Sequence, residues 1–175
     1  MVQASAAGCQ ECRPFLEALE EKLPPPNHTL ILRELIARLR QARLEGLEPG
    51  EEEERARRLN DLGNALSALG RRDEALAPAQ EAVDIRRKLA HSNPAAFLPD
   101  LAMSLGAFGS VLSSLEQHEK AAGIFAEGLQ HIAPFYQEHP DAFAPLAGSL
   151  QDSYLQSCRE ADIKPDEKLL IMRKK

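Results

Sequence analysis

The chain has 175 residues, of which 43% are hydrophobic and 27% charged, and its formal net charge is −6 at pH 7. This is the composition of a soluble globular chain long enough to bury a core. The negative charge argues against nucleic acid or an anionic membrane as a general partner, because both bind clustered cations. The three cysteines are odd in number, and Met1 to Gly8 contains neither a basic nor an apolar leader segment, so we expect a cytoplasmic protein.

Apolar residues recur at helical spacing along most of the chain, and no strand-like alternation of four or more residues interrupts them. Residues 1–12 carry little pattern and are expected to be frayed. Helices are expected over 13–23, 28–46, 51–69, 73–91, 99–115, from 118 past 132, and over 143–160. The predicted fold class is therefore all-α, with about seven helices paired antiparallel across short loops.

A run of four glutamates, residues 51–54, stands directly before Arg55, Arg57 and Arg58. Carboxylates favour the positive end of a helix dipole. Pairs four residues apart, such as Glu54 with Arg58, stabilise a helix by about 0.2–0.5 kcal/mol each. The run therefore predicts a helix start, with a docking patch as the alternative.

Two stretches of the sequence match each other at an offset of 46 residues. Gly63 corresponds to Gly109, and Ala75 corresponds to Ala121. A unit of helical hairpin size that repeats at one period is the signature of a solenoid. Solenoids usually bind other proteins rather than transform small molecules.

Both stretches resemble the tetratricopeptide repeat, in which small residues let the two helices of a hairpin approach closely. The slots of the repeat are filled by Leu59, Leu62, Gly63, Leu66, Ala75, Ala79 and Ala82 in the first copy, and by Leu105, Phe108, Gly109, Leu112, Ala121, Phe125 and Gly128 in the second. The usual period is about 34 residues. The longer period here resembles the extended subclass found in kinesin light chains and in multi-repeat bacterial signalling proteins. The resemblance covers about residues 51–160 and implies a right-handed solenoid.

The repeat also divides the chain. We expect a frayed or disordered N-terminus over 1–12, a degenerate helical hairpin over 13–50, full repeats over 51–94 and 95–140, and a capping helix with a tail over 141–175. Two full repeats are fewer than the three that a stable array usually needs. The remaining core must come from the degenerate hairpin, from the capping helix or from a second chain.

In such repeats the first helix of each hairpin lines a concave face on which peptides lie. The residues expected there are Arg57, Asn60, Asn64, Ser67, Met103, Ser110 and Ser113. Asn60 and Asn64 lie one turn apart, and an amide both donates and accepts hydrogen bonds, so the pair could bind a peptide backbone. The alternative is a solvated helix face without a ligand.

The sequence contains no nucleophile elbow, phosphate loop or dinucleotide fingerprint, so we expect neither an enzyme nor a cofactor. Cys9 and Cys12 have the spacing of half a zinc site, but no second cysteine pair follows. Glu127 and His131 are one helical turn apart and lack a third ligand, so no metal site is expected.

These observations predict a non-catalytic scaffold that binds a peptide or helix of a partner protein on its concave face. Two other readings stay open. The chain could be a regulatory or sensor segment of a larger multidomain signalling protein. It could also self-associate into a homo-oligomer through its C-terminal helices.

Overall fold

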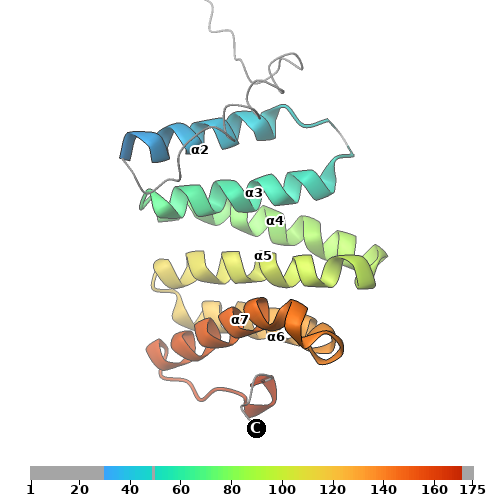
Figure 1. The fold of residues 1–175 in the computed structure, drawn as a ribbon. Coiled ribbons are helices and arrows are strands. Elements are labelled where there is room, and N and C mark those ends of the chain that lie inside the picture. Colours follow the sequence, from blue (N-terminus) through green and yellow to red (C-terminus); the bar gives the residue numbers. More distant parts are fainter. Residues whose placement is uncertain (1–29, 49, 171–175) are drawn as a thin grey trace, which may run out of the picture.

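The computed structural model describes residues 30–48 and 50–170. Its helices stack in successive layers (Figure 1): α2 (Leu30–Glu45), α3 (Glu52–Ala68), α4 (Arg72–Ser92), α5 (Pro94–Ser114), α6 (His118–Glu138), α7 (Pro140–Glu160) and the short 3-10 helix η3 (Glu167–Leu169). These residues include no strand, and consecutive helices pack against each other as in a helical-repeat solenoid. The all-α fold class is therefore confirmed. The helix expected over 13–23 and the N-terminus before it lie outside the described residues.

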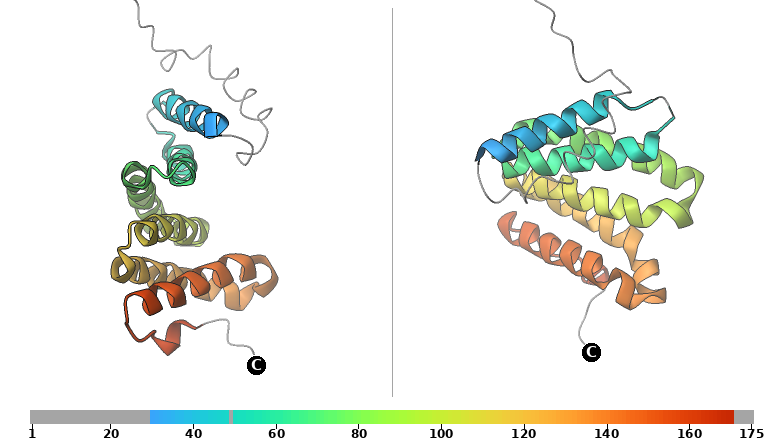
Figure 2. Two further views of the ribbon diagram at one scale, coloured as in Figure 1. Left: turned by 90° about the vertical axis from the view of Figure 1, so that its left-hand side faces the viewer. Right: turned by 45° about the horizontal axis from the view of Figure 1, so that its top comes forward.

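The 46-residue period holds in three dimensions. The bounds of α4 and α6 differ by 46 at both ends, and so do those of α5 and α7. Seen from the side, α3, α5 and α7 alternate with α4 and α6 (Figure 2). We therefore refer to α3, α5 and α7 as the first helices and to α2, α4 and α6 as the second helices, with α7 in the position that opens a third hairpin.

Each first helix ends in the same left-handed turn. The residue in this turn is Gly70 after α3 (φ +77°), Glu116 after α5 (φ 61°) and Asp162 after α7 (φ 53°). The next residue donates its N–H to a carbonyl in the last helical turn: Arg71 to Leu66 at 3.0 Å, Gln117 to Leu112 at 3.0 Å and Ile163 to Cys158 at 2.9 Å. This is the hydrogen bond of a Schellman motif. Gly70 ends its helix as predicted, and the turn recurs where glycine does not.

Two helix starts differ from the prediction. α5 begins at Pro94 rather than near Pro99, and α7 begins at Pro140 rather than at Phe143. A proline fits the first helical position because no backbone N–H is needed there. Asn93 caps α5, since its side chain accepts a hydrogen bond from the Ala96 N–H at 3.4 Å. Only one residue therefore separates α4 from α5.

The glutamate run opens α3 as predicted, but its ion pairs are partly different. Glu54 pairs with Arg58 at 2.6 Å, four residues on. Arg55 does not pair with Glu51 and instead reaches Glu81 of α4 at 2.6 Å. Arg57 also pairs with Glu54 rather than with the expected Glu53. The glutamate run therefore stabilises the start of α3, and Arg55 adds a contact to α4.

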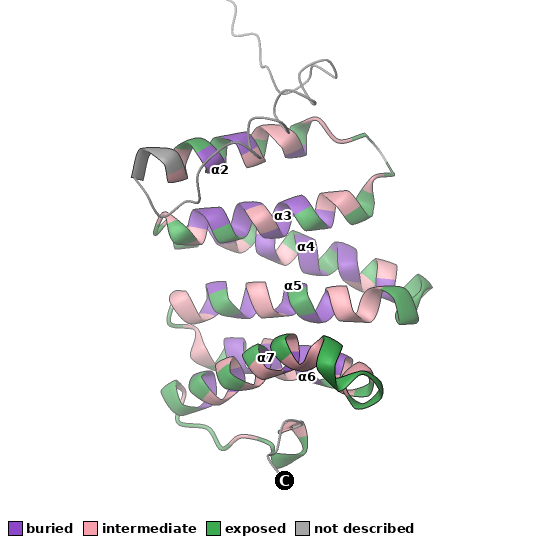
Figure 3. Cartoon of the chain, in the orientation of Figure 1, coloured by how far each residue is buried: buried purple, intermediate pink, exposed green. Residues whose placement is uncertain are grey.

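The core lies along the sides of the helices that face each other (Figure 3). All predicted repeat slots in both copies are buried. Helical spacing in α2 predicts a buried stripe of Leu32, Leu35, Leu39 and Ala42, and this is wrong in part, because Leu35 is 41% exposed while Ile36 and Leu44 are buried. The buried side of α2 is therefore shifted by about one residue from the predicted stripe, with Ile36 and Ala37 facing inward.

α5 contains an 18-residue stretch that is long and apolar enough to cross a membrane by length and composition alone. It lies in the middle of the stack, with α4 on one side and α6 on the other. Of this stretch, 44% is buried in the stack, so packing against the neighbouring helices accounts for part of its apolar character.

Candidate partner-binding surface

The predicted face of the first helices is divided by the structure into exposed and inward-facing residues. Four of the seven expected residues are exposed: Arg57, Asn64, Met103 and Ser110. The other three, Asn60, Ser67 and Ser113, are turned at least partly toward neighbouring helices. Met103 is 49% exposed and is one of three large apolar side chains that the described residues leave open.

Asn60 is a packing residue, and the prediction that it faces a peptide is wrong. Its side chain is 9% exposed, and its Nδ2 donates a hydrogen bond of 2.7 Å to Oγ of Ser104 on α5, which is fully buried. A buried amide donor needs such a partner, because leaving it unpaired costs about 1–3 kcal/mol. The Oδ1 of the same amide is buried without a hydrogen-bond partner among the described residues. Asn60 therefore joins two successive first helices and leaves Asn64 alone on the surface.

One repeat later, the corresponding contact between α5 and α7 is apolar. Gly106 and Leu150 correspond to Asn60 and Ser104 at the 46-residue offset. Leu150 is 2% exposed, and a Cβ added at Gly106 would lie 3.1 Å from its Cδ2. Small residues in α5 thus make room for a leucine of α7.

A groove of about 530 Å³ opens between α5 and α7. We call it the α5–α7 groove. Two of the predicted residues, Ser110 and Ser113, line it together with Phe125 of α6 and with Asp152, Ser153, Leu155, Gln156, Ser157 and Arg159 of α7. The structure therefore brings one part of the predicted face to a concave site and adds a wall that was not predicted.

The wall on α7 carries hydrogen-bonding and charged groups. Asp152, Gln156 and Arg159 are exposed, and each lies one helical turn from the next. They correspond at the 46-residue offset to Gly106, Ser110 and Ser113, so extending the period by one more helix could have found them. Ser113 itself is bonded to Ser157 across the groove, with 3.2 Å between the hydroxyl oxygens.

The end of the stack is covered by the chain itself. Tyr154 and Cys158 of α7 are buried, at 6% and 1% exposure. The hydroxyl oxygen of Tyr154 accepts a hydrogen bond of 2.9 Å from the N–H of Asp166, and burial raises the pKa of this hydroxyl. The half-buried Leu169 of η3 packs against the core. The segment after α7 thus occupies the side on which the second helix of a third hairpin would lie.

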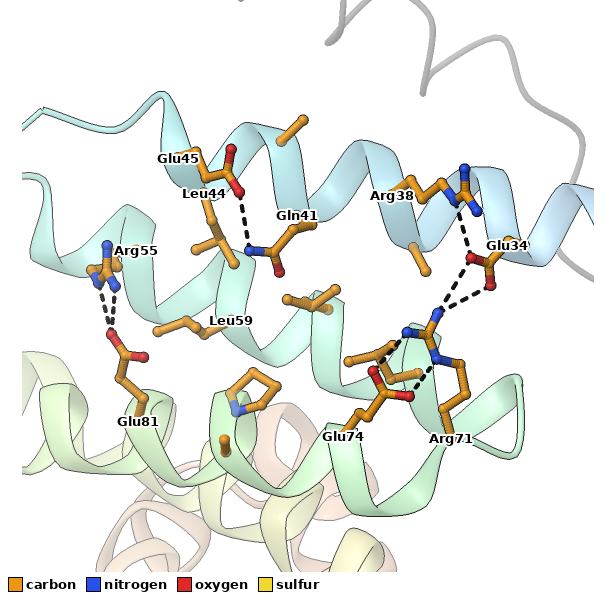
Figure 4. A pocket seen from close by; sticks show the side chains of 16 residues that line it. Glu34, Arg38, Gln41, Leu44, Glu45, Arg55, Leu59, Arg71, Glu74 and Glu81 are labelled. Atoms are coloured by element: carbon orange, nitrogen blue, oxygen red, sulfur yellow. Dashed lines mark hydrogen bonds and ion pairs between the residues drawn. The ribbon is translucent and has the colours of Figure 1, made fainter. Parts of the chain in front are cut away.

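A second kind of groove runs between successive second helices. The α2–α4 groove measures about 790 Å³, and its floor includes Leu59, Leu62 and Leu66 of α3 (Figure 4). The α4–α6 groove measures about 750 Å³, and its floor includes Phe108 and Leu112 of α5. Phe108 and Leu112 are the 46-residue counterparts of Leu62 and Leu66, so the two grooves are repeats of one feature.

Ion pairs bridge the α2–α4 groove at one end. Arg71 lies between Glu34 of α2 and Glu74 of α4, at 3.1 and 2.6 Å (Figure 4). The hydrogen bond from Arg38 and the charge of Arg71 hold the pKa of Glu34 below its usual value. The hydrogen bond from Arg71 does the same for the pKa of Glu74. We call this arrangement the Arg71 clasp.

Acidic and histidine side chains near the grooves form ion pairs rather than a metal-binding cluster. In the part of the chain that the structure describes, no three His, Cys, Asp or Glu side chains are grouped to hold a metal ion. Glu127 and His131 lie together at 3.7 Å, and Glu127 is also paired with Arg87 of α4 at 2.8 Å. Cys9 and Cys12 lie outside the described residues.

Residues 55–92 match the family model described as tetratricopeptide repeat. The match covers nearly all of α3 and the whole of α4, which is the first copy identified in the sequence. It does not distinguish the extended-period subclass, which stays a prediction. No curated protein is similar enough to the chain to count as a match.

Proposed function

We propose that the chain is a non-catalytic scaffold for a partner protein, because residues 55–92 match the family model of the tetratricopeptide repeat, which is a protein–protein interaction module. The partner places a peptide or a helix across the first helices α3, α5 and α7, and the α5–α7 groove is the centre of contact. The exposed Met103 of α5 and Asn64 of α3 would extend the contact beyond this centre.

The α5–α7 groove is the observation that carries the proposal. Its small residues on α5 leave room for partner side chains, and Phe125 supplies an apolar floor. Ser153 and Gln156 offer donors and acceptors to a peptide backbone. The thioether of Met103 is flexible and adapts to irregular apolar surfaces.

Filling the groove tests the proposal. A partner is first captured with the full chain and identified by mass spectrometry, and its binding segment is then made as a synthetic peptide. Ser110 is exposed and lines the groove, so Ser110→Arg should weaken peptide binding at least about tenfold, a change of about 1.4 kcal/mol. Ser92→Arg, at an exposed serine near the end of α4, is the matched control.

Calorimetric titration of both variants gives the answer, with thermal melting to confirm that each is folded. Unchanged affinity of the Ser110→Arg variant would remove the α5–α7 groove from the partner-binding site.

A further inference from the structure

The α4–α6 groove has the same construction as the α2–α4 groove but lacks the Arg71 clasp, and its two helices are joined instead at the other end by the Arg87–Glu127 ion pair. At the 46-residue offset, Gln80, Gln117 and Lys120 replace Glu34, Arg71 and Glu74. Gln80 turns along its own helix to Asp84, with 3.0 Å between Nε2 and Oδ1. Nζ of Lys120 donates to Gln117 at 2.9 Å, which is also on its own side of the groove. Neither side chain bridges to the opposite helix.

The sign of the charge at this end is reversed between the two grooves. Glu74 is an anion that holds the guanidinium of Arg71 over the α2–α4 groove. Lys120 is an exposed cation at the corresponding place, and none of the carboxylates in the described residues lies within ion-pair distance of it. The group that would complement Lys120 is therefore a carboxylate.

The rest of the α4–α6 groove is apolar except for Asp73 of α4 and for Glu127 of α6, and the charge of Glu127 is paired with Arg87 of α4 at 2.8 Å. Phe108 and Leu112 form the floor, and the half-buried Leu76 of α4 and Ile124 of α6 form the two walls. At Gly123, which also lines the groove, α6 has no side chain that would extend into it. A trough between two helices above a third is the shape into which an amphipathic helix packs its apolar side.

We propose that the α4–α6 groove docks an amphipathic helix of a protein partner. The apolar stripe of that helix lies on Phe108, Leu76 and Ile124, and a glutamate or aspartate at its edge pairs with Lys120. This carboxylate takes the place that the guanidinium of Arg71 takes in the α2–α4 groove. The proposal does not depend on the peptide site between the first helices, because the α4–α6 groove is formed by the second helices.

Two synthetic peptides test this docking. Both form amphipathic helices with the same leucine stripe, and one carries glutamates at the edge where the other carries lysines. Fluorescence anisotropy with the full chain at low salt should show the glutamate peptide binding at least about threefold tighter, as one surface ion pair allows. The difference should shrink as salt is added, because exposed charges are screened.

Three variants assign the binding to this groove. Lys120→Glu should reverse the preference, so that the lysine peptide binds tighter. Ile124→Asp should weaken both peptides at least about tenfold, because it places a charge on the apolar wall. Lys88→Glu makes the same charge change at another exposed position and should leave the preference as it was.

The proposal is overturned if neither peptide binds or if Lys120→Glu leaves the preference unchanged. It is also overturned in favour of a second copy of the chain if light scattering shows a dimer that Ile124→Asp dissociates. Lys120 is exposed, so its variant keeps the test decisive even if Ile124→Asp fails to fold.

Discussion

At the scale of single residues, the two copies of the repeat pack the same helix crossing with different side chains. Gly63 packs against Ala79, and a Cβ added at Gly63 would lie 3.5 Å or more from its neighbours. Gly109 packs against Phe125, the counterpart of Ala79, and an added Cβ would lie 2.7 Å from the ring. The glycine is therefore required by sterics only in the second copy, where the larger partner uses the space.

We expect Gly63→Ala and Gly109→Ala to change stability in opposite directions. In a helix, alanine is favoured over glycine by about 1 kcal/mol, and Gly63→Ala has room to show this gain. At Gly109 the buried ring of Phe125 must move, and overpacking costs about 1–3 kcal/mol. Urea unfolding followed by circular dichroism measures both. Equal shifts of the two midpoints would show that the ring of Phe125 moves aside without lowering the stability.

At the scale of elements, α2 is attached to the stack by arginines as well as by apolar side chains. Arg33 donates to the carbonyl of Ala68 at 3.0 Å, and Arg40 donates to that of Asp61 at 2.8 Å. The Arg71 clasp adds a contact from α2 to the start of α4. Exposed ion pairs are weak and sensitive to conditions, so α2 should be the described helix whose attachment depends most on pH.

Acid should loosen α2 before it affects the other helices. The pKa values of Glu34 and Glu74 are lowered in the folded chain from an ordinary value of 4.5. Their contribution to stability is therefore complete above that value and is lost as the pH falls through their folded pKa values. Amide hydrogen exchange, corrected for its intrinsic pH dependence, should show the protection of α2 falling in this range.

The variant Arg71→Gln should remove much of this pH dependence, because it takes away the partner shared by the two carboxylates. Arg72→Gln, at the exposed neighbouring residue, is the control. If α2 loses protection at the same pH in both variants, the clasp does not govern its attachment.

At the scale of the whole molecule, the order and number of the described helices could be predicted because glycine and alanine recur where helices cross. The buried slots could be predicted for the same reason. The contacts between repeats could not, because they depend on how far one hairpin is staggered against the next. Asn60 meets Ser104 at a separation of 44 residues rather than 46, and no sequence signal gives that stagger.

The stagger between successive hairpins also explains why one wall of the candidate site does not follow from the sequence. The repeat predicts that α7 is a capping helix, and a cap has no second hairpin beside it that would mark its outer residues as a binding wall. The 46-residue offset relates Asp152, Gln156 and Arg159 to the predicted face of α5. Only the position of α7 beside α5 shows that they form the other wall of one groove. The start of α5 was missed for a local reason, since Pro94 is typical of a linker and of a first helical turn alike.

Mapping the footprint of a bound partner tests the proposed function most directly. Amide hydrogen exchange is measured along the full chain with and without the partner segment. Binding at the proposed site should slow exchange in α5 and α7 around Ser110 and Gln156 and leave the outer side of α4 unchanged. Slowed exchange confined to α2, or to α4 and α6, would show that the partner does not use the face of the first helices.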